Sequence, residues 1–357
     1  MADDKKKFLV TGGAGFIGGN FVAKLLGEQS GQVLVLDKLT YAGHLITLKN
    51  WADNPDYQFV EGDIADQELV GRLLSEFKPN YLVNFAAESH VDRSIDAAAD
   101  FVQTNIVGTH ILLEKSVEYW RSLGGDRTKF HFQHVSTDEV YGSLGPTGYF
   151  QESTPYAPNS PYAASKAASD HLVRAYYHTY GLPATITNCS NNYGPYQFPE
   201  KLIPLALGNA LKGEAIPIYG DGQNVRDWVY VEDHCEALLS VLAHGHPGET
   251  YNIGGNCERT NIELVAQIIA VLQEYEQLPA DRPFERFIEF VTDRPGHDRR
   301  YAIDASKIGR ELGWQPRFTF NEAIRKTVRW YLDNQEWCTA VIKENYDGSR
   351  LGRLQND

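Results

Sequence analysis

The sequence has few cysteines, no excess of basic residues and no long apolar run. Its four cysteines (Cys189, Cys235, Cys257 and Cys338) are far apart and form no C-x-x-C pair, which argues against a disulfide framework or a zinc site and fits a reducing cytosol. The formal net charge of −14 disfavours nucleic acid and anionic membranes as partners. No apolar signal core follows Met1 and no stretch is long enough to span a membrane. We therefore expect a cytoplasmic protein without a metal.

Strand-like and helix-like segments alternate along the first half of the chain. Short apolar runs typical of buried strands occur at residues 8–10, 33–36, 57–60 and 81–87. Helical apolar spacing occurs at residues 16–26, 67–77 and 101–123. This alternation predicts an α/β protein with a doubly wound parallel sheet of the Rossmann type, in which ligands bind at the carboxyl ends of the strands.

A glycine-rich turn follows the first of these strands. Gly12, Gly15 and Gly18 have the spacing G-x-x-G-x-x-G at the start of the first expected helix. Glycine permits the tight turn and lets main-chain N–H groups at a helix N-terminus approach a pyrophosphate. The second strand ends in Asp37, where a carboxylate binds ribose hydroxyls and repels a 2′-phosphate. Strand, turn, helix, strand and acid in this order predict a dinucleotide site that favours NAD over NADP.

Two further stretches of this half are candidates for contact with the cofactor. Asp63 follows the third strand, where it either meets the adenine or closes a simple turn. Ala86 and Ala87 end the fourth expected strand, and their small side chains would let a cofactor lie close. Both stretches lie at the edge of the sheet where a ligand is expected.

Tyr162 and Lys166 are four residues apart in a segment, residues 160–181, that we expect to be a helix. They then share one face of the helix, where an ammonium beside a phenol stabilises the phenolate and lowers its pKa. Tyr162 would then accept a proton from a sugar hydroxyl near neutral pH. On its own this spacing is more typical of a packed tyrosine and a surface lysine. The preceding strand, which ends in Ser-Thr, makes the catalytic interpretation the better one.

A hydroxyl and two carboxylates stand at the end of that preceding strand, residues 131–135. Thr137 would orient a substrate hydroxyl, and the acids Asp138 and Glu139 follow it directly. Two close carboxylates push their pKa values apart, so that one can act as an acid while the other acts as a base. Elimination of water needs such a pair in addition to the hydride chemistry of a nicotinamide. The alternative interpretation of the pair is a solvated turn.

Together these motifs are similar to those of the extended short-chain dehydrogenase/reductase family. The resemblance rests on residues 11–18, on Ser136-Thr137 and on the Tyr162/Lys166 pair. More narrowly, residues 37–43 (DKLTYAG), residues 86–94 (AAESHVDRS) and the Asp138-Glu139 pair resemble the dTDP-glucose 4,6-dehydratases, and the similarity extends nearly end to end. Related epimerases usually have small neutral residues in place of the two acids. GDP-mannose dehydratases and UDP-glucuronate decarboxylases tend to have Ser-Glu there.

The resemblance implies a lyase of deoxysugar biosynthesis that converts dTDP-glucose into dTDP-4-keto-6-deoxyglucose and water with a tightly held NAD. It assigns Glu139 as the base at carbon 5 and Asp138 as the acid at the carbon 6 hydroxyl. Hydride returns to carbon 6, so NAD is regenerated. The expected catalytic set is Thr137, Asp138, Glu139, Tyr162 and Lys166. The alternatives are a 4,6-dehydratase or 4-epimerase for a UDP-, CDP- or GDP-sugar and, as a less favoured one, an NAD-binding sensor without catalysis.

The resemblance also implies two sets of contacts. The cofactor set, besides Tyr162 and Lys166, is Gly12, Gly15, Phe16, Ile17, Gly18, Asp37, Lys38, Leu39, Thr40, Gly43, Asp63, Ile64, Phe85, Ala86, Ala87, Thr104 and Asn192. The substrate set is Ser89, Thr137, Asn191, Lys201, Leu202, Pro217, Ile218, Tyr219, Arg226, Asn261, Arg294 and His297. Arg226 and the basic loop at residues 293–300 are candidates for the diphosphate, and Tyr219 for the thymine, although each alone is more typical of a surface.

The second half of the chain is expected to form a smaller α/β lobe for the substrate. A polar stretch at residues 188–195 suits the crossing between the lobes, and helices are expected at residues 231–243, 261–278 and 321–343. We expect interleaved lobes: residues 1–190 plus 227–258 for NAD, and residues 191–226 plus 259–357 for the nucleotide sugar. The resemblance further implies a homodimer with residues 101–123 and 160–180 at its interface.

Overall fold

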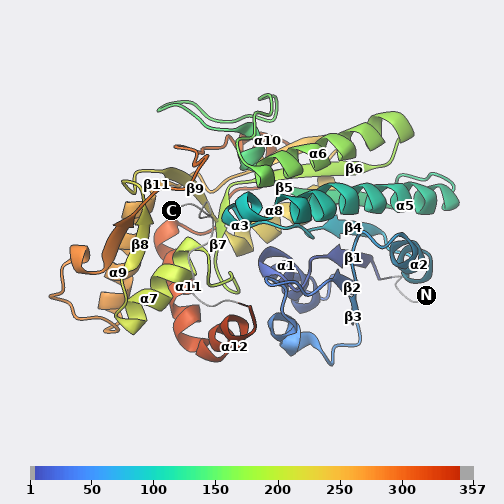
Figure 1. Ribbon diagram of the computed structural model, residues 1–357. Coiled ribbons are helices and arrows are strands. Elements are labelled where there is room, and N and C mark those ends of the chain that lie inside the picture. The colour runs from blue at the N-terminus through green and yellow to red at the C-terminus, as the bar shows by residue number, and fades with distance from the viewer. Residues whose placement is uncertain (1–4, 346–357) are drawn as a thin grey trace.

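A seven-stranded sheet forms the centre of the computed structural model, which describes residues 5–345 (Figure 1). Its strand order is β10-β6-β5-β4-β1-β2-β3, and all neighbours are parallel. The strands are β1 (Lys7–Thr11), β2 (Gln32–Asp37), β3 (Tyr57–Glu61), β4 (Tyr81–Asn84), β5 (His131–Thr137), β6 (Ala184–Cys189) and β10 (Thr250–Ile253). The doubly wound parallel sheet predicted from the sequence is confirmed. The chain order reverses between β1 and β4, which is where such sheets bind ligands.

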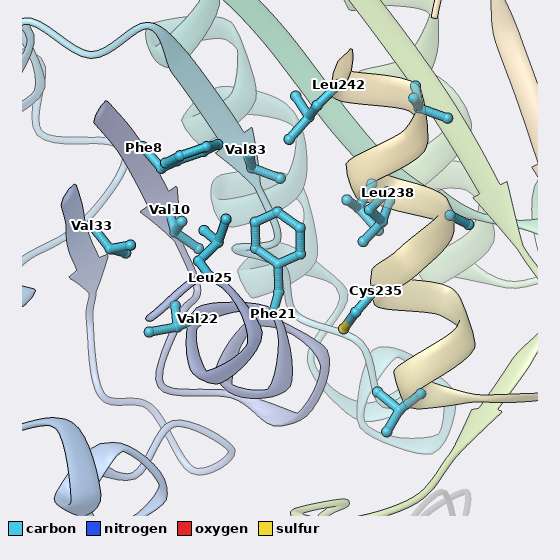
Figure 2. Close-up of a cluster of buried hydrophobic side chains, with 14 of the residues drawn as sticks. Phe8, Val10, Phe21, Val22, Leu25, Val33, Val83, Cys235, Leu238 and Leu242 are labelled. Atoms are coloured by element: carbon cyan, nitrogen blue, oxygen red, sulfur yellow. The ribbon is translucent and has the colours of Figure 1, made fainter. Parts of the chain in front are cut away.

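Helices cover both faces of this sheet because its buried strands are apolar on both sides. Phe8 and Val10 of β1 pack with Phe21 of α1 and with Leu238 of α8, as Figure 2 shows. Leu9, between them, points the other way into a second core with α2, α5 and α6. The helices of this half are α1 (Phe16–Gly27), α2 (Gln67–Phe77), α3 (Val91–Asp96), α4 (Ala98–Phe101), α5 (Thr109–Ser122), α6 (Pro161–Tyr180) and α8 (Val231–His244).

A second group of elements carries its own core. A three-stranded sheet consists of β7 (Asn191–Tyr193), β9 (Val225–Tyr230) and β11 (Glu258–Thr260), and a two-stranded one of β8 (Ile216–Tyr219) and β12 (Ile288–Val291). Around them lie α7 (Leu202–Lys212), α9 (Asn261–Glu274), α11 (Phe320–Asp333) and α12 (Gln335–Asn345), gathered away from α2 and α5 in Figure 1. The short α10 (Ser306–Leu312) returns to the first core, where Ile308 packs with residues of α8.

Three predicted helices differ from the expectation. The helix expected at residues 261–278 ends at Glu274. The helix expected at residues 321–343 is two helices that meet at Asn334, whose φ of −121° and ψ of 43° are not helical. Trp330 before the bend and Trp337 after it both pack edge-on against Tyr196. The apolar sequence pattern therefore continues through the bend and does not reveal it. The helix expected at residues 101–123 contains a wider π turn at Val102–Gly108.

The π turn places Asn105 in contact with the segment after β4 and with α6. Asn105 exchanges two hydrogen bonds with the main chain of Glu88 (2.9 and 3.0 Å), and its amide also donates to Ser165 of α6 at 2.8 Å. Such wide turns are frequent at functional sites.

Within residues 5–345, none of the helices is both long and apolar enough to cross a bilayer, and the four cysteines are free thiols.

Candidate active site

A cavity of about 300 Å³ lies at the carboxyl ends of β1, β2, β4 and β5. Every residue of the expected cofactor set lines it except Leu39. Leu39 has a left-handed backbone (φ 54°), and its N–H donates to Asp37 Oδ1 at 2.9 Å. It shapes the turn after β2, and its contact with the cofactor stays a prediction.

The glycine turn leaves the N-terminus of α1 open toward this cavity. No side chain caps that terminus, so its main-chain N–H groups are available to an anion. A Cβ on Gly12 would lie 2.6 Å from the main-chain nitrogen of Ala86, and one on Gly18 only 2.3 Å from the carbonyl oxygen of Gly12. Only glycine permits this close packing of β1, α1 and the segment after β4. The surface therefore fits a pyrophosphate.

Acidic side chains line the part of the cavity near the ends of β2 and β3. Asp37 is buried, and Oδ2 accepts from the N–H of Ala14 at 2.9 Å, which leaves lone pairs for ribose hydroxyls. Lys38 and Asp63 form an ion pair of 2.7 Å across the cavity rim, and the N–H of Ala65 donates to Asp63 at 2.8 Å. Asp63 thus closes a turn and also faces the cavity, so the two interpretations of this residue coexist.

The expected catalytic residues meet at the end of β5. Thr137, Asp138, Glu139, Tyr162 and Lys166 all line the cavity. Thr137 caps a short 3-10 turn, Asp138–Tyr141, by accepting from the N–H of Glu139 at 3.3 Å. This cap points the two carboxyl groups that follow the strand toward the active-site cavity.

The two acids differ in their surroundings. Burial and the neighbouring charge of Glu139 hold the pKa of Asp138 well above its usual range, and Asp138 Oδ2 is buried without a hydrogen-bond partner among residues 5–345. Burial also raises the pKa of Glu139, but Arg294 and Arg226 oppose that rise. Burial thus raises the pKa of both acids, and the opposing positive charge comes from Arg226 at Asp138 and from both Arg226 and Arg294 at Glu139. An acid and a base in one site need surroundings that differ in this way.

The residues of the chain do not lower the pKa of Tyr162, so the lowering expected from the sequence is wrong when only these residues are considered. Burial and the charge of Glu139 raise the pKa of Tyr162 well above its ordinary value, and only a hydrogen bond with Thr137 opposes them. Lys166 lies on the same helix face, yet its ammonium donates to the main-chain oxygen of Val135 at 2.8 Å. Burial, followed by the charge of Glu139, therefore decides the direction of the pKa shift of the phenol.

A second cavity, of about 760 Å³, adjoins the first on the side of α7 and α12. Every residue of the expected substrate set lines it except Thr137, which lines the first cavity. The residues common to both walls are Ser89, Glu139, Asn191, Gln197, Glu200 and Lys201. Glu139 is therefore the member of the catalytic set that faces both cavities.

Three basic side chains bring positive charge to the junction of the cavities. Arg226 is buried and donates to the main-chain oxygen of Asp298 at 2.9 Å, and Lys201 donates to that of Ser89 at 3.2 Å. Arg294 Nη1 forms an ion pair of 2.8 Å with Asp92, while its Nε is buried without a hydrogen-bond partner in the described part of the chain. In a protein of net charge −14, this local cluster fits an anionic ligand.

The loop at residues 293–300 contributes less than expected. Arg294 and His297 line the second cavity, but Arg299 pairs with Asp221 at the surface (2.8 Å) and Arg300 with Glu258 (2.7 Å). The last two arginines therefore bind carboxylates of the chain itself, and within this loop the diphosphate candidates that line the cavity are Arg294 and His297. Tyr219, which was expected at the thymine, donates from its hydroxyl to Asp92 at 3.0 Å.

Comparisons with known proteins now add to this geometry. A family model described as GDP-mannose 4,6 dehydratase matches residues 9–327. The dTDP-glucose 4,6-dehydratase of Xanthomonas campestris pv. campestris is 60% identical over 346 residues, which are 97% of this chain and 98% of the relative. The chain belongs to the dTDP-glucose 4,6-dehydratase family.

Solved structures of dTDP-glucose 4,6-dehydratases have the same fold. The enzyme from Bacillus anthracis, in complex with NAD, is 49% identical with a TM-score of 0.84 and covers 94% of this chain and 99% of its own. The enzyme from Streptomyces venezuelae, with NAD and TYD bound, is 48% identical with a TM-score of 0.86 and the same coverage. The family resemblance, the fold and the NAD dependence expected from the sequence are confirmed for this family.

The sequence did not point to several residues of the site. Glu200 lines both cavities and pairs with Arg93 at 3.1 Å, and its place directly before Lys201 was the available signal. Asp92, which binds both Arg294 and Tyr219, lies inside the stretch that carried the family resemblance. The C-terminal helix α12 was expected only to pack, yet it contributes Gln335, Cys338, Thr339 and Ile342 to the second cavity. Nothing in its amphipathic pattern distinguishes a cavity wall from a core.

Proposed function

We propose that the chain dehydrates dTDP-glucose to dTDP-4-keto-6-deoxyglucose and water, with NAD held in the first cavity and the sugar nucleotide in the second. The observation that carries the proposal is the adjacent Asp138-Glu139 pair, in which Asp138 lines the first cavity and Glu139 lines both. An epimerase has no need of this pair, and neither has a sensor. Family membership, NAD-bound relatives and the fit of the first cavity support the same conclusion.

The cofactor would be held by the glycine turn at its pyrophosphate, by Asp37 at its ribose and by Lys166 near its nicotinamide. When bound, NAD supplies reversible hydride transfer and, in its oxidised form, a positive charge. The groups of the chain itself keep Tyr162 protonated. Ionisation of this phenol therefore requires additional positive charge nearby.

The protein residues would then divide the proton transfers among themselves. Tyr162, oriented by Thr137, accepts the proton of the carbon 4 hydroxyl. Glu139 accepts the proton at carbon 5, which the new ketone acidifies, and Asp138 donates its proton to the carbon 6 hydroxyl as it leaves. Glu139 later returns its proton to carbon 5, where the hydride removed from carbon 4 has been delivered to the neighbouring carbon 6. The proton that Tyr162 gained replaces, through solvent, the one that Asp138 gave up, so the protein ends as it began and the net change is the loss of water.

Mass spectrometry of dTDP-glucose incubated with the purified holoprotein, without added reductant, tests this function. A product lighter by one water, without net formation of NADH, is the expected result. A product of unchanged mass and altered stereochemistry would identify an epimerase. If dTDP-glucose does not react, CDP-, UDP- and GDP-glucose are the next substrates, and turnover of one of them would replace the proposed substrate.

Two further features belong to this proposal. We propose an NAD-binding domain at residues 1–190 plus 227–258 and a substrate lobe at residues 191–226 plus 259–357, with residues 1–4 and 346–357 outside the described part of the chain. The boundaries at 226/227 and 258/259 pass through β9 and β11, and α10 of the second range packs on the first core. We also propose a homodimer with residues 101–123 and 160–180 at its interface, supported by one exposed apolar side chain in each segment, Val102 and Tyr180. Light scattering of the purified protein should give twice the chain mass, and a Tyr180→Glu variant should be shifted toward the monomer.

A further inference from the structure

Lys166 carries a charge that the catalytic residues do not balance. The side chain is buried, 3% exposed, and burial lowers its pKa. Its ammonium contacts the main-chain oxygen of Val135 at 2.8 Å and lies 3.4 Å from His134 Nε2. Both contacts are neutral groups, whereas a buried ammonium requires a negative partner to stay ionised.

Asp170 lies one helical turn further along α6, on the same face. It is 2% exposed. Its Oδ2 accepts three hydrogen bonds, from Ser136 (2.9 Å), Tyr156 (3.0 Å) and Asn188 (3.3 Å). Its Oδ1 has no hydrogen-bond partner in the described residues and lies 3.4 Å from His134 Nε2. One oxygen is thus anchored, and the other faces the imidazole that also contacts the lysine.

His134 is held as a neutral spacer between these two charges. Thr11 Oγ1 donates to Asn84 Oδ1 at 2.6 Å, which turns the amide nitrogen of Asn84 toward His134 Nδ1 at 3.1 Å. That nitrogen donates, so Nδ1 accepts and the imidazole proton lies on Nε2. Nε2 is 3.2 Å from Ser169 Oγ. Burial and Lys166 keep the pKa of His134 well below its usual value.

We propose that Asp170 is the buried counter-charge of Lys166 and acts on the reaction through that lysine, with His134 as a neutral spacer fixed by Asn84. Asp170 is then a positioning residue that reaches neither substrate nor cofactor. The proposal rests on the role of Lys166 in the proposed function. The competing view is that Asp170 only ties together Ser136, Tyr156 and Asn188.

The two views differ in what happens at alkaline pH. The titratable groups around Asp170 and Lys166 are His134 on β5, Tyr156 before α6, Tyr141 in the 3-10 turn and Cys189 at the end of β6, whose pKa burial raises to about 12. Burial raises the pKa of both tyrosines far above the usual value, and it keeps His134 neutral. Lys166 is therefore the group of this cluster that loses its charge as the pH rises. Asp170 opposes that loss because its charge raises the pKa of Lys166.

The test compares Asp170→Asn with Tyr156→Phe in the holoprotein. Asparagine removes the charge, whereas Tyr156→Phe removes one hydrogen bond to Asp170 and leaves the charge in place. The first readout is the fraction of NAD retained after gel filtration at increasing pH, which needs no turnover. We expect the alkaline midpoint of NAD retention to move to lower pH in Asp170→Asn and to stay unchanged in Tyr156→Phe. Equal midpoints in wild type and both variants would overturn the proposal.

A second readout separates this inference from the proposed function. In a Glu139→Gln background, the pH dependence of NADH formation from dTDP-glucose should show the same alkaline shift upon Asp170→Asn. Absence of NADH in Glu139→Gln alone would count against the proposed function, while the NAD-retention result would still decide the role of Asp170.

A stability cycle covers the case in which Asp170→Asn does not fold. Lys166→Met removes the charge that needs a partner, so the double variant Lys166→Met/Asp170→Asn should be more stable than Asp170→Asn. Thermal denaturation of both single variants and of the double variant measures this coupling. If Lys166→Met folds and the double variant is as unstable as Asp170→Asn, Asp170 is a structural tie and the proposal fails.

Discussion

Replacement of Glu139 by glutamine should separate the two halves of the reaction. The side chain keeps its size but can no longer accept a proton. Loss of a general base typically costs about 10²–10⁴-fold in rate, and we expect dehydration to fall by that factor. Thr137, Tyr162 and Lys166 are unchanged, so oxidation at carbon 4 should continue and NADH should accumulate.

The structure predicts a second, opposite effect of this substitution. The charge of Glu139 is the largest contribution after burial to the raised pKa of Tyr162. Removing that charge lowers the pKa of the phenol, so the phenolate is present at lower pH than in the wild type. NADH formation by the variant should therefore begin at lower pH, while dehydration is lost at every pH.

Rapid mixing of the holoprotein with dTDP-glucose, followed by the absorbance of reduced nicotinamide, measures the first half. Nuclear magnetic resonance in deuterated water measures exchange at carbon 5, which should disappear in the variant. Glu76→Gln, on the exposed side of α2, is the control and should behave as wild type. Full turnover or undiminished exchange in Glu139→Gln would refute the assignment of the base.

Three further substitutions test the binding surfaces. Gly18→Ala places a Cβ 2.3 Å from a carbonyl oxygen, so it should destabilise the fold by about 1–3 kcal/mol and release NAD. Denaturation and cofactor analysis measure the two effects. The control Gly71→Ala, where the nearest atom would be 3.6 Å from the new Cβ, should be neutral or stabilising. Asp92→Asn weakens the ion pair with Arg294 and should raise KM for dTDP-glucose about tenfold with little change in kcat; an unchanged KM would exclude a positioning role. Asp37→Asn removes the charge that repels a 2′-phosphate, so equilibrium binding should show a smaller preference for NAD over NADP.

Features that depend on neighbouring residues in the sequence could be predicted well. The glycine turn, the acid that ends β2 and the alternation of strands and helices each follow from local pattern and backbone sterics. They place Gly12, Asp37 and Thr137 at one edge of the sheet, as the structure does. The two acids after Thr137 could be recognised for the same reason, since the strand delivers them together.

Features that depend on distant partners could not be predicted. Lys166 shares a helix face with Tyr162, but the ammonium of Lys166 contacts Val135 and His134 of β5. Helical spacing alone therefore predicted the wrong direction for the pKa shift of the Tyr162 phenol. Arg299 is indistinguishable from Arg294 in sequence, and only the fold reveals that it pairs with Asp221. The bend at Asn334 is set by tertiary packing of aromatic rings, which leaves the helical periodicity intact.

The wall common to the two cavities has a consequence for the order of events in a catalytic cycle. A ligand in either cavity meets residues that a ligand in the other cavity also touches, so we expect the two affinities to be linked. Thermodynamic reciprocity requires that whatever factor NAD adds to the affinity for the sugar nucleotide, the sugar nucleotide adds to the affinity for NAD. If that factor exceeds one, the cofactor binds most tightly while the sugar nucleotide is bound. Loss of the cofactor at that stage would leave the keto intermediate unable to complete the reaction.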